Sequence, residues 1–156
     1  MNTKNTVLFV DDNLTDVKIY AEKIKHKGFN VYLCRNLRNA RHYIDKNSEK
    51  IAIVVIDLMF TNGDYGGLEQ YNDKIKRNSM NQGQLLGAYL DEKYGNIEYI
   101  YLSYTIKAYT GNSANETQSK RLFSKDEQEH VLNRIFSVLN KPQAIKNPEQ
   151  DSPSEN

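Results

Sequence analysis

The fold of this chain is decided by the stretch Ile51-Ala52-Ile53-Val54-Val55-Ile56-Asp57-Leu58-Met59, an uninterrupted apolar run that contains a single carboxylate. A run without alternation and rich in β-branched side chains is typical of a central parallel strand with both faces covered by helices. In open α/β sheets, ligands and chemistry gather outside the carboxyl ends of the strands, where Asp57 is expected to lie. An aspartate that only caps a turn would also fit this position, so the other strands must decide.

The 156-residue chain has the size of one domain with a core of its own. Its net charge of +1 argues against a broad nucleic-acid-binding surface. The lone Cys34 cannot form an internal disulfide, and no apolar stretch approaches the roughly 20 residues that a membrane-spanning helix needs. The apolar run at residues 7–10 is too short for a signal peptide, so we expect a cytoplasmic protein without nucleic-acid or membrane partners.

Strand patterns alternate with helix patterns along the chain. The expected strands are residues 6–10, 29–34, 51–57, 97–103 and 122–124. Apolar side chains at helical spacing form stripes, which are Val17, Tyr20, Ala21 and Ile24, then Leu37, Ala40 and Ile44, and last Val131, Leu132, Ile135, Phe136 and Leu139. Asn13 or Thr15 and then Asn36 are expected to cap the first two helices, and Gly28 to end the first. A βαβ series of this kind predicts an α/β fold with a parallel sheet and helices on both faces.

Three stretches depart from this alternation. Residues 60–96 are long for a bare loop, and their glycines and two weak helical patterns predict an extended segment with at least one short added helix. The polar stretch 104–120 makes a poor helix. Residues 140–156 have the composition of a disordered tail, which leaves residues 1–139 as the domain.

Polar side chains stand at the ends of four expected strands. Asp11 and Asp12 follow the first strand, Asp57 ends the third, Ser103 ends the fourth and Lys125 follows the fifth. Because parallel strands end at one edge of the sheet, these side chains are expected to meet there. Singly, each has a simpler explanation, since the acidic pair can favour the positive end of a helix and the lysine can be an ordinary surface residue. As a set they predict a functional site.

This set closely resembles the active site of the receiver (CheY-like) domain of two-component response regulators, over about residues 6–139 without the interval 60–96. The resemblance implies a flavodoxin-like three-layer sandwich with a five-stranded parallel sheet in the order 2-1-3-4-5. It also implies that Asp57 accepts a phosphoryl group from a phosphohistidine on a histidine kinase or a histidine phosphotransfer protein. Such a domain signals by protein contact and is not a conventional enzyme.

The resemblance implies a magnesium site as well. Asp11, Asp12, Asp57 and the backbone carbonyl of Met59 would hold the ion in this family. Mg²⁺ prefers oxygen ligands in octahedral geometry, and a cation relieves the mutual repulsion of three neighbouring acids.

The same positions suit phosphoryl transfer. The Asp57 carboxylate can attack phosphorus and hold the group as an acyl phosphate. Lys125 would neutralise phosphoryl charge, and the Ser103 hydroxyl would bond a phosphoryl oxygen. Met59 and Thr105, each two residues past a site residue, would restrict access of the hydrolytic water, so we expect a long-lived phospho-Asp57.

Two positions differ from the family pattern. Receivers usually have a proline after the conserved lysine, joined by a cis bond, whereas Asp126 stands here. A non-proline cis peptide costs about 2.5–4 kcal/mol, so we expect a trans bond. Leu122 replaces the usual switching aromatic residue of the fifth strand.

Two alternatives stay open. A pseudo-receiver would keep the acids and signal by binding alone, which the degenerate stretch 104–120 favours. A phosphatase of the haloacid-dehalogenase type would need Asp-x-Asp-x-Thr after the first strand, whereas the chain has Asp11-Asp12-Asn13-Leu14-Thr15. That alternative also leaves Asp57 without a role.

Overall fold

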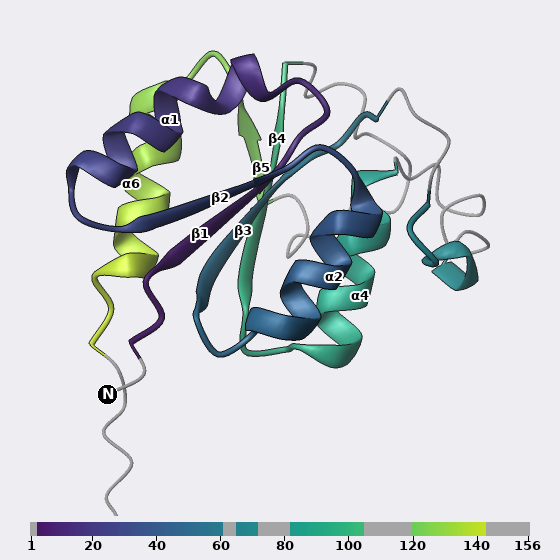
Figure 1. The fold of residues 1–156 in the computed structure, drawn as a ribbon. Coiled ribbons are helices and arrows are strands. Elements are labelled where there is room, and N and C mark those ends of the chain that lie inside the picture. Colours follow the sequence, from purple (N-terminus) through teal and green to yellow (C-terminus); the bar gives the residue numbers. More distant parts are fainter. Residues whose placement is uncertain (1–2, 61–64, 72–81, 105–119, 143–156) are drawn as a thin grey trace, which may run out of the picture.

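The computed structural model describes residues 3–60, 65–71, 82–104 and 120–142 (Figure 1). The elements in chain order are β1 (Thr6–Val10), α1 (Leu14–His26), β2 (Asn30–Cys34), α2 (Leu37–Asn47), β3 (Ile51–Asp57), the 3-10 turn η1 (Glu69–Tyr71), α4 (Gly83–Lys93), β4 (Glu98–Ser103), β5 (Leu122–Ser124) and α6 (Gln128–Leu139).

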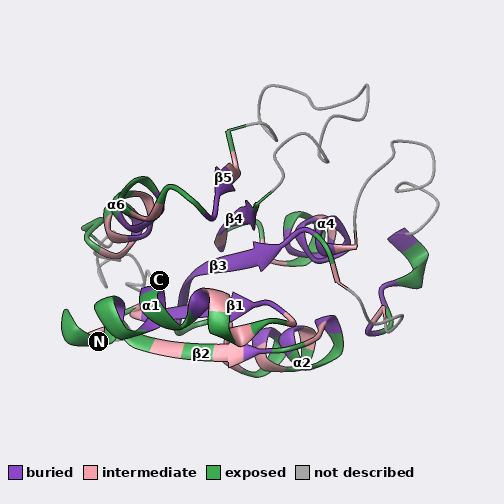
Figure 2. Ribbon diagram, turned by 90° about the horizontal axis from the view of Figure 1, so that it is seen from above, coloured by how far each residue is buried: buried purple, intermediate pink, exposed green. Residues whose placement is uncertain are grey.

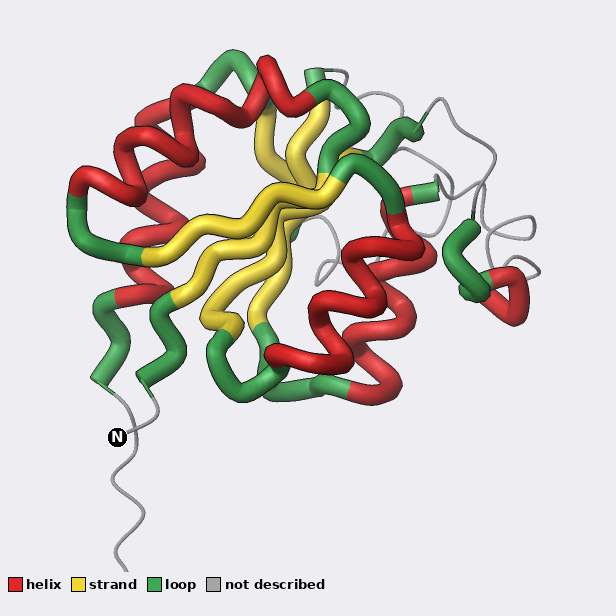
Figure 3. Tube along the Cα trace, in the orientation of Figure 1, coloured by secondary structure: helices red, strands yellow, loops and turns green. Residues whose placement is uncertain are grey.

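The five strands form one parallel sheet in the order β2-β1-β3-β4-β5. Helices α1 and α6 cover one face of this sheet, and α2 and α4 cover the other (Figures 1 and 3). The predicted flavodoxin-like three-layer sandwich with strand order 2-1-3-4-5 is therefore confirmed.

Strand β3 lies at the centre of the sheet, and all of its residues are buried (Figure 2). Its side chains alternate between two cores: Val54 and Ile56 belong to the core under α2 and α4, and Ile53 and Val55 to the core under α1 and α6. A helix layer on each face explains why the sequence of β3 is apolar without alternation.

The helix ends follow the sequence signals. The Asn13 side chain accepts a hydrogen bond from the Thr15 amide at 3.2 Å, and the Asn36 side chain accepts one from the Asn39 amide at 2.8 Å. Gly28 follows α1 with a φ of +89°, a conformation that side chains with a Cβ rarely adopt. Local sequence therefore sets where α1 and α2 begin and where α1 ends.

The interval between β3 and β4 contains η1 and α4, and its residues 61–64 and 72–81 lie outside the described residues. The expectations about the stretch 104–120, including Thr105, and about the tail 140–156 fall almost entirely outside them as well. Among the helices that the structure describes, none has the length and apolar character needed to cross a membrane.

Candidate functional site

The register of the sheet brings the strand ends together. Val10 of β1 pairs with Ile56 of β3, so Asp11 comes level with Asp57. On the other side of β3, Asp57 pairs with Leu102, one residue before Ser103. Ser103 in turn pairs with Ser124, and Lys125 follows directly.

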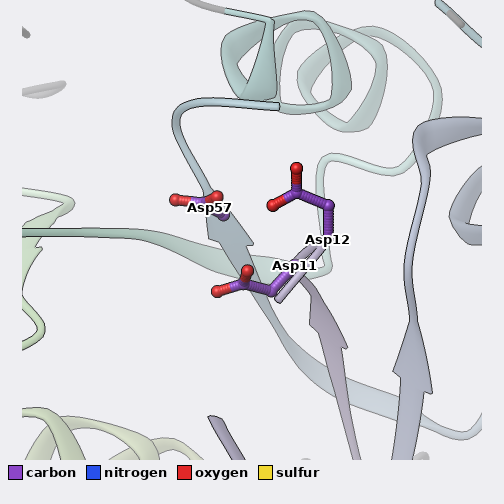
Figure 4. A group of neighbouring side chains, drawn as sticks. All are labelled: Asp11, Asp12 and Asp57. Carbon is purple, nitrogen blue, oxygen red and sulfur yellow. The ribbon is translucent and has the colours of Figure 1, made fainter. Parts of the chain in front are cut away.

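Asp11, Asp12 and Asp57 form an acidic cluster at this edge (Figure 4). Each offers a carboxylate oxygen, and these oxygens all lie within 4.8 Å of one another. Opposite ligands of an octahedral Mg²⁺ ion are about 4 Å apart, so small side-chain movements would bring the three oxygens around one ion. The donor set, made of hard carboxylate oxygens, also fits this ion.

Burial makes this cluster electrostatically costly in the absence of a cation. Asp11 is 2% exposed and Asp57 is 7% exposed. Burial raises the pKa of Asp57 to about 7, and the negative charge of Asp11 adds to this effect, while Lys125 and the Met59 amide oppose it. Burial also raises the pKa of Asp11, against its hydrogen bonds with Lys125 and the Asn13 amide. The cluster therefore has more negative charge than its protein partners balance.

Lys125 is the buried cation of the site. Its Nζ lies 2.8 Å from Asp11 Oδ2, 3.3 Å from Asp16 Oδ2 and 3.6 Å from Asp57 Oδ1. Burial alone would lower the pKa of Lys125, but the hydrogen bond with Asp11 and the charge of Asp57 raise it above the ordinary value. The ammonium is therefore positive and is shared among three carboxylates.

The backbone of Lys125 is held from both sides. Its amide donates to the Ser103 carbonyl at 3.0 Å, and its carbonyl accepts from the Tyr20 hydroxyl at 3.1 Å. The next amide, that of Asp126, donates to Ser124 Oγ at 3.2 Å. No cis peptide bond occurs among the described residues, so the Lys125–Asp126 bond is trans as expected.

Ser103 and Met59 are placed differently from each other. Ser103 is 4% exposed at the end of β4, on the buried edge where the acids lie. Met59 donates its backbone N–H to the Asp57 carboxylate, and the residue is 55% exposed. The proposed role of the Met59 carbonyl as a metal ligand stays a prediction.

Sequence reasoning missed three residues around Lys125. Asp16 lies in the first turn of α1, where its acidity was no more than a helix-dipole signal. Tyr104 places its ring 5.1 Å from Lys125 Nζ, and burial and then the charge of Asp16 raise the pKa of its hydroxyl. Tyr20 had a usable signal, because a tyrosine in an aliphatic buried stripe brings a hydroxyl that needs a partner.

A fourth missed residue is Gly83, the first residue of α4. Its amide donates to the Leu58 carbonyl at 3.0 Å, and a Cβ at this position would overlap the Asp57 carbonyl oxygen and lie 2.9 Å from the Asp57 carbonyl carbon. The absence of a side chain therefore lets α4 begin against the end of β3.

No family model matches the sequence, and no curated protein matches it either. Solved structures of receiver domains share its fold. The signal receiver domain of a putative LuxO repressor from Vibrio parahaemolyticus is 13% identical, with a TM-score of 0.60 over 87% of this chain and 90% of that one. The receiver domain of the Francisella response regulator 1452 is 18% identical, with a TM-score of 0.60 over 86% of this chain and 96% of that one.

A third similar structure is the CheX–CheY–BeF3–Mg²⁺ complex from Borrelia burgdorferi. Its matching chain is 20% identical, with a TM-score of 0.58 over 87% of this chain and 90% of that one. The chain thus has the fold of a CheY-like receiver domain of response regulators.

Proposed function

We propose that this protein is a receiver module that takes a phosphoryl group on Asp57 and signals by protein contact. The observation that carries the proposal is the shared ammonium of Lys125, which lies 2.8 Å from Asp11 and 3.6 Å from Asp57. Those three side chains come from the ends of β1, β3 and β5, and each is less than a tenth exposed. A structural ion pair needs one acid, whereas this arrangement adds a second buried acid whose carboxylate is a potential nucleophile.

In the transfer step, a carboxylate oxygen of Asp57 forms a bond to phosphorus, and the bond from phosphorus to the donor breaks. The donor atom is an imidazole nitrogen of phosphohistidine, which leaves with the electron pair of the broken bond and takes up a proton. In this proposal Lys125 would neutralise charge on the phosphoryl oxygens, and the Ser103 hydroxyl would donate a hydrogen bond to one of them. We therefore expect a histidine kinase or a histidine phosphotransfer protein as donor.

Asp11, Asp12 and Asp57 would hold Mg²⁺ at this site. When bound, the ion supplies positive charge beside the phosphoryl oxygens. The raised pKa of Asp57 supports this assignment, because a carboxylate that is partly protonated near neutral pH is a poor nucleophile until a cation favours its charged form.

The haloacid-dehalogenase alternative finds no support at Asn13. That alternative needs a general acid at this position, but the Asn13 side chain caps α1, and the Asn13 backbone N–H donates to Asp11 Oδ1 at 2.9 Å. The pseudo-receiver alternative differs from our proposal only in whether Asp57 takes up a phosphoryl group.

The direct test is to incubate the protein with Mg²⁺ and acetyl phosphate, or phosphoramidate as a P–N donor, and to measure its intact mass. The expected result is a gain of one phosphoryl group by the wild type and none by Asp57→Asn. Glu22→Gln removes an exposed carboxylate of α1 and is the matched control, which should behave as the wild type.

A wild-type protein without a mass gain would support the pseudo-receiver alternative. A gain that persists in Asp57→Asn would place the phosphoryl group on another residue. A gain that needs no divalent cation would contradict the metal assignment.

A further inference from the structure

Among the described acids that pair with Lys125, Asp16 is the one that the proposed chemistry leaves unused. Its Oδ2 lies 3.3 Å from Lys125 Nζ, and its side chain is 21% exposed, compared with 2% for Asp11. An ammonium has three N–H donors, and two of them are hydrogen-bonded to Asp11 and Asp16. The lysine that should contact the phosphoryl group is therefore already held by a carboxylate outside the acidic cluster.

A bound cation and a phosphoryl group would change two of the three partners of Lys125, Asp11 and Asp57, but not Asp16. A cation bound by Asp11 takes electron density from that carboxylate, and transfer to Asp57 consumes the other carboxylate as an acyl phosphate. Asp16 is outside the three-acid cluster, so neither the cation nor the phosphoryl group would bond to its carboxylate. Its hold on Lys125 is thus strongest, relative to the other two, when a phosphoryl group is present.

Tyr104 covers the same pair from outside. Its ring lies 5.1 Å from Lys125 Nζ, the atom that also pairs with Asp16 Oδ2 at 3.3 Å. A ring in this position displaces water from one side of the ion pair, and a lower local dielectric strengthens every charge interaction there.

We propose that Asp16 is a positioning residue that makes this site bind a divalent cation more tightly and accept a phosphoryl group more slowly. The inference rests on the proposed function and goes beyond it by assigning a regulatory carboxylate to the site. Asp16 offsets the positive charge of Lys125, so an approaching cation meets less repulsion. The same offset weakens the attraction of Lys125 for an anionic phosphoryl donor and adds one negative charge beside the dianionic product.

Asp16 is proposed to strengthen cation binding and to slow phosphoryl transfer. These opposite effects distinguish it from a residue that only supports the structure. A residue that only props up Lys125 would, on removal, weaken cation binding and phosphoryl transfer together. Removal of a charge that favours cations and disfavours phosphate would weaken cation binding and speed phosphoryl transfer. The sign of the second change therefore decides between the two roles.

The variant that isolates the charge is Asp16→Asn, because an amide oxygen can still accept a hydrogen bond from Lys125. Mg²⁺ affinity is measured by calorimetric titration, and phosphorylation by intact mass over time at saturating Mg²⁺ with acetyl phosphate. We expect Asp16→Asn to raise the Mg²⁺ dissociation constant several-fold and to speed phosphorylation on the order of tenfold at low salt. Both changes should shrink as ionic strength rises, because Asp16 is partly exposed.

Two variants serve as controls. Asp16→Glu keeps the charge and should stay near the wild type in both measurements. Glu22→Gln removes a charge from the exposed face of the same helix, two turns from the site, and should change neither measurement.

A double variant tests the role of Tyr104. In a Tyr104→Ala background, Asp16→Asn should have a smaller effect than it has in the wild type, because water then screens the ion pair of Asp16 and Lys125.

Slower phosphorylation in Asp16→Asn, with weaker Mg²⁺ binding, would overturn the proposal and make Asp16 a structural support. Unchanged values in both measurements would also overturn it. If the wild type takes up no phosphoryl group, the proposed function fails, and the claim about transfer fails with it. The Mg²⁺ titration then still decides whether Asp16 strengthens cation binding.

Discussion

Two regions of this protein place carboxylates next to polar partners, and the regions differ in the charge of those partners. At the carboxyl edge of the sheet, Lys125 is the ammonium shared by Asp11, Asp16 and Asp57. Around α4, the carboxylates accept hydrogen bonds from neutral tyrosine hydroxyls. These pairs are Tyr71 with Glu92, Tyr89 and Tyr94 with Asp45, and Tyr99 with Asp91.

The difference separates a polar cluster with uncompensated buried charge from one whose carboxylates lie at the surface. The tyrosine hydroxyls supply donors to surface carboxylates, and Arg41 Nε lies 3.9 Å from Asp45 Oδ2. The acidic cluster has an excess of buried negative charge, and the raised pKa of Asp57 reports its cost. We therefore expect the carboxyl edge to respond to cations and phosphoryl groups, and the α4 network to respond only in stability.

The largest expected effect is at Lys125. Lys125→Met keeps the length of the side chain but removes the charge that would stabilise the phosphoryl oxygens. The rate of phosphorylation by acetyl phosphate should fall by about 10²–10³-fold, as for loss of one preorganised charge in a buried site. Lys23→Met, an exposed change on α1, is the control. A rate within a few-fold of the wild type would remove Lys125 from the site.

The next effect concerns Gly83, where α4 begins against the end of β3. Gly83→Ala would force a Cβ against the Asp57 carbonyl, which belongs to a buried strand and cannot move away cheaply. We expect the free energy of unfolding to fall by about 2–4 kcal/mol, measured in urea. Gly95→Ala is the control, because its Cβ would meet nothing closer than the Asp91 carbonyl oxygen at 3.9 Å. Equal stability of the two variants would show that α4 can shift freely.

The third prediction concerns pH. In the folded state the pKa of Asp57 is about 7, above the ordinary value of 3.8. Between these two pH values the folded protein holds a proton on Asp57 that the unfolded chain has lost. This contribution to stability is complete below pH 3.8 and is lost as pH rises toward 7. With a chelator present, Asp57→Asn should therefore be more stable than the wild type by about 1–3 kcal/mol at pH 8, and this advantage should shrink toward pH 4.

Thermal or urea unfolding across that pH range checks this prediction. Excess Mg²⁺ should reduce the advantage of the asparagine, because the cation stabilises the charged carboxylate of the wild type. Stability curves that run parallel from pH 4 to pH 8 would contradict the buried-charge interpretation.

A smaller effect is expected in the tyrosine network. Tyr99→Phe removes the hydroxyl that donates to Asp91 Oδ2 at 2.9 Å. Because Asp91 is exposed and regains water, the cost should be about 0.5–1 kcal/mol of unfolding free energy. Mg²⁺ affinity should not change. A clear change in Mg²⁺ affinity would show that the two polar regions are coupled through α4.

An effect of similar size is expected on the lifetime of the phosphoryl group. Met59, two residues past Asp57, is 55% exposed, and its apolar side chain cannot orient a water molecule. Met59→Asn supplies polar atoms there and should shorten the lifetime of phospho-Asp57 by about two- to tenfold, less than a well-placed general base contributes. Loss of the adduct after removal of the donor measures it. Slower decay in Met59→Asn would show that Met59 does not shield the acyl phosphate.

Much of the fold could be predicted because local patterns fix single elements. The apolar run of β3, the helical stripe of α1 and the caps at Asn13 and Asn36 each depend on residues within a few positions of one another. Strand β5 came out with the predicted bounds, Leu122–Ser124. Sequence also placed Asp11, Asp12, Asp57 and Lys125 at one edge, since parallel strands share their direction.

The sequence by itself thus determined the α/β class, the strand order through its resemblance to receivers, and which polar residues end the strands. Only the tertiary structure decided how those residues are partnered. The contacts of Asp16 and Tyr104 with Lys125, and that of Gly83 with Asp57, join residues far apart in the chain. Sequence periodicity reports on single helices and strands. These contacts depend on how the elements pack against one another, so periodicity carries no information about them.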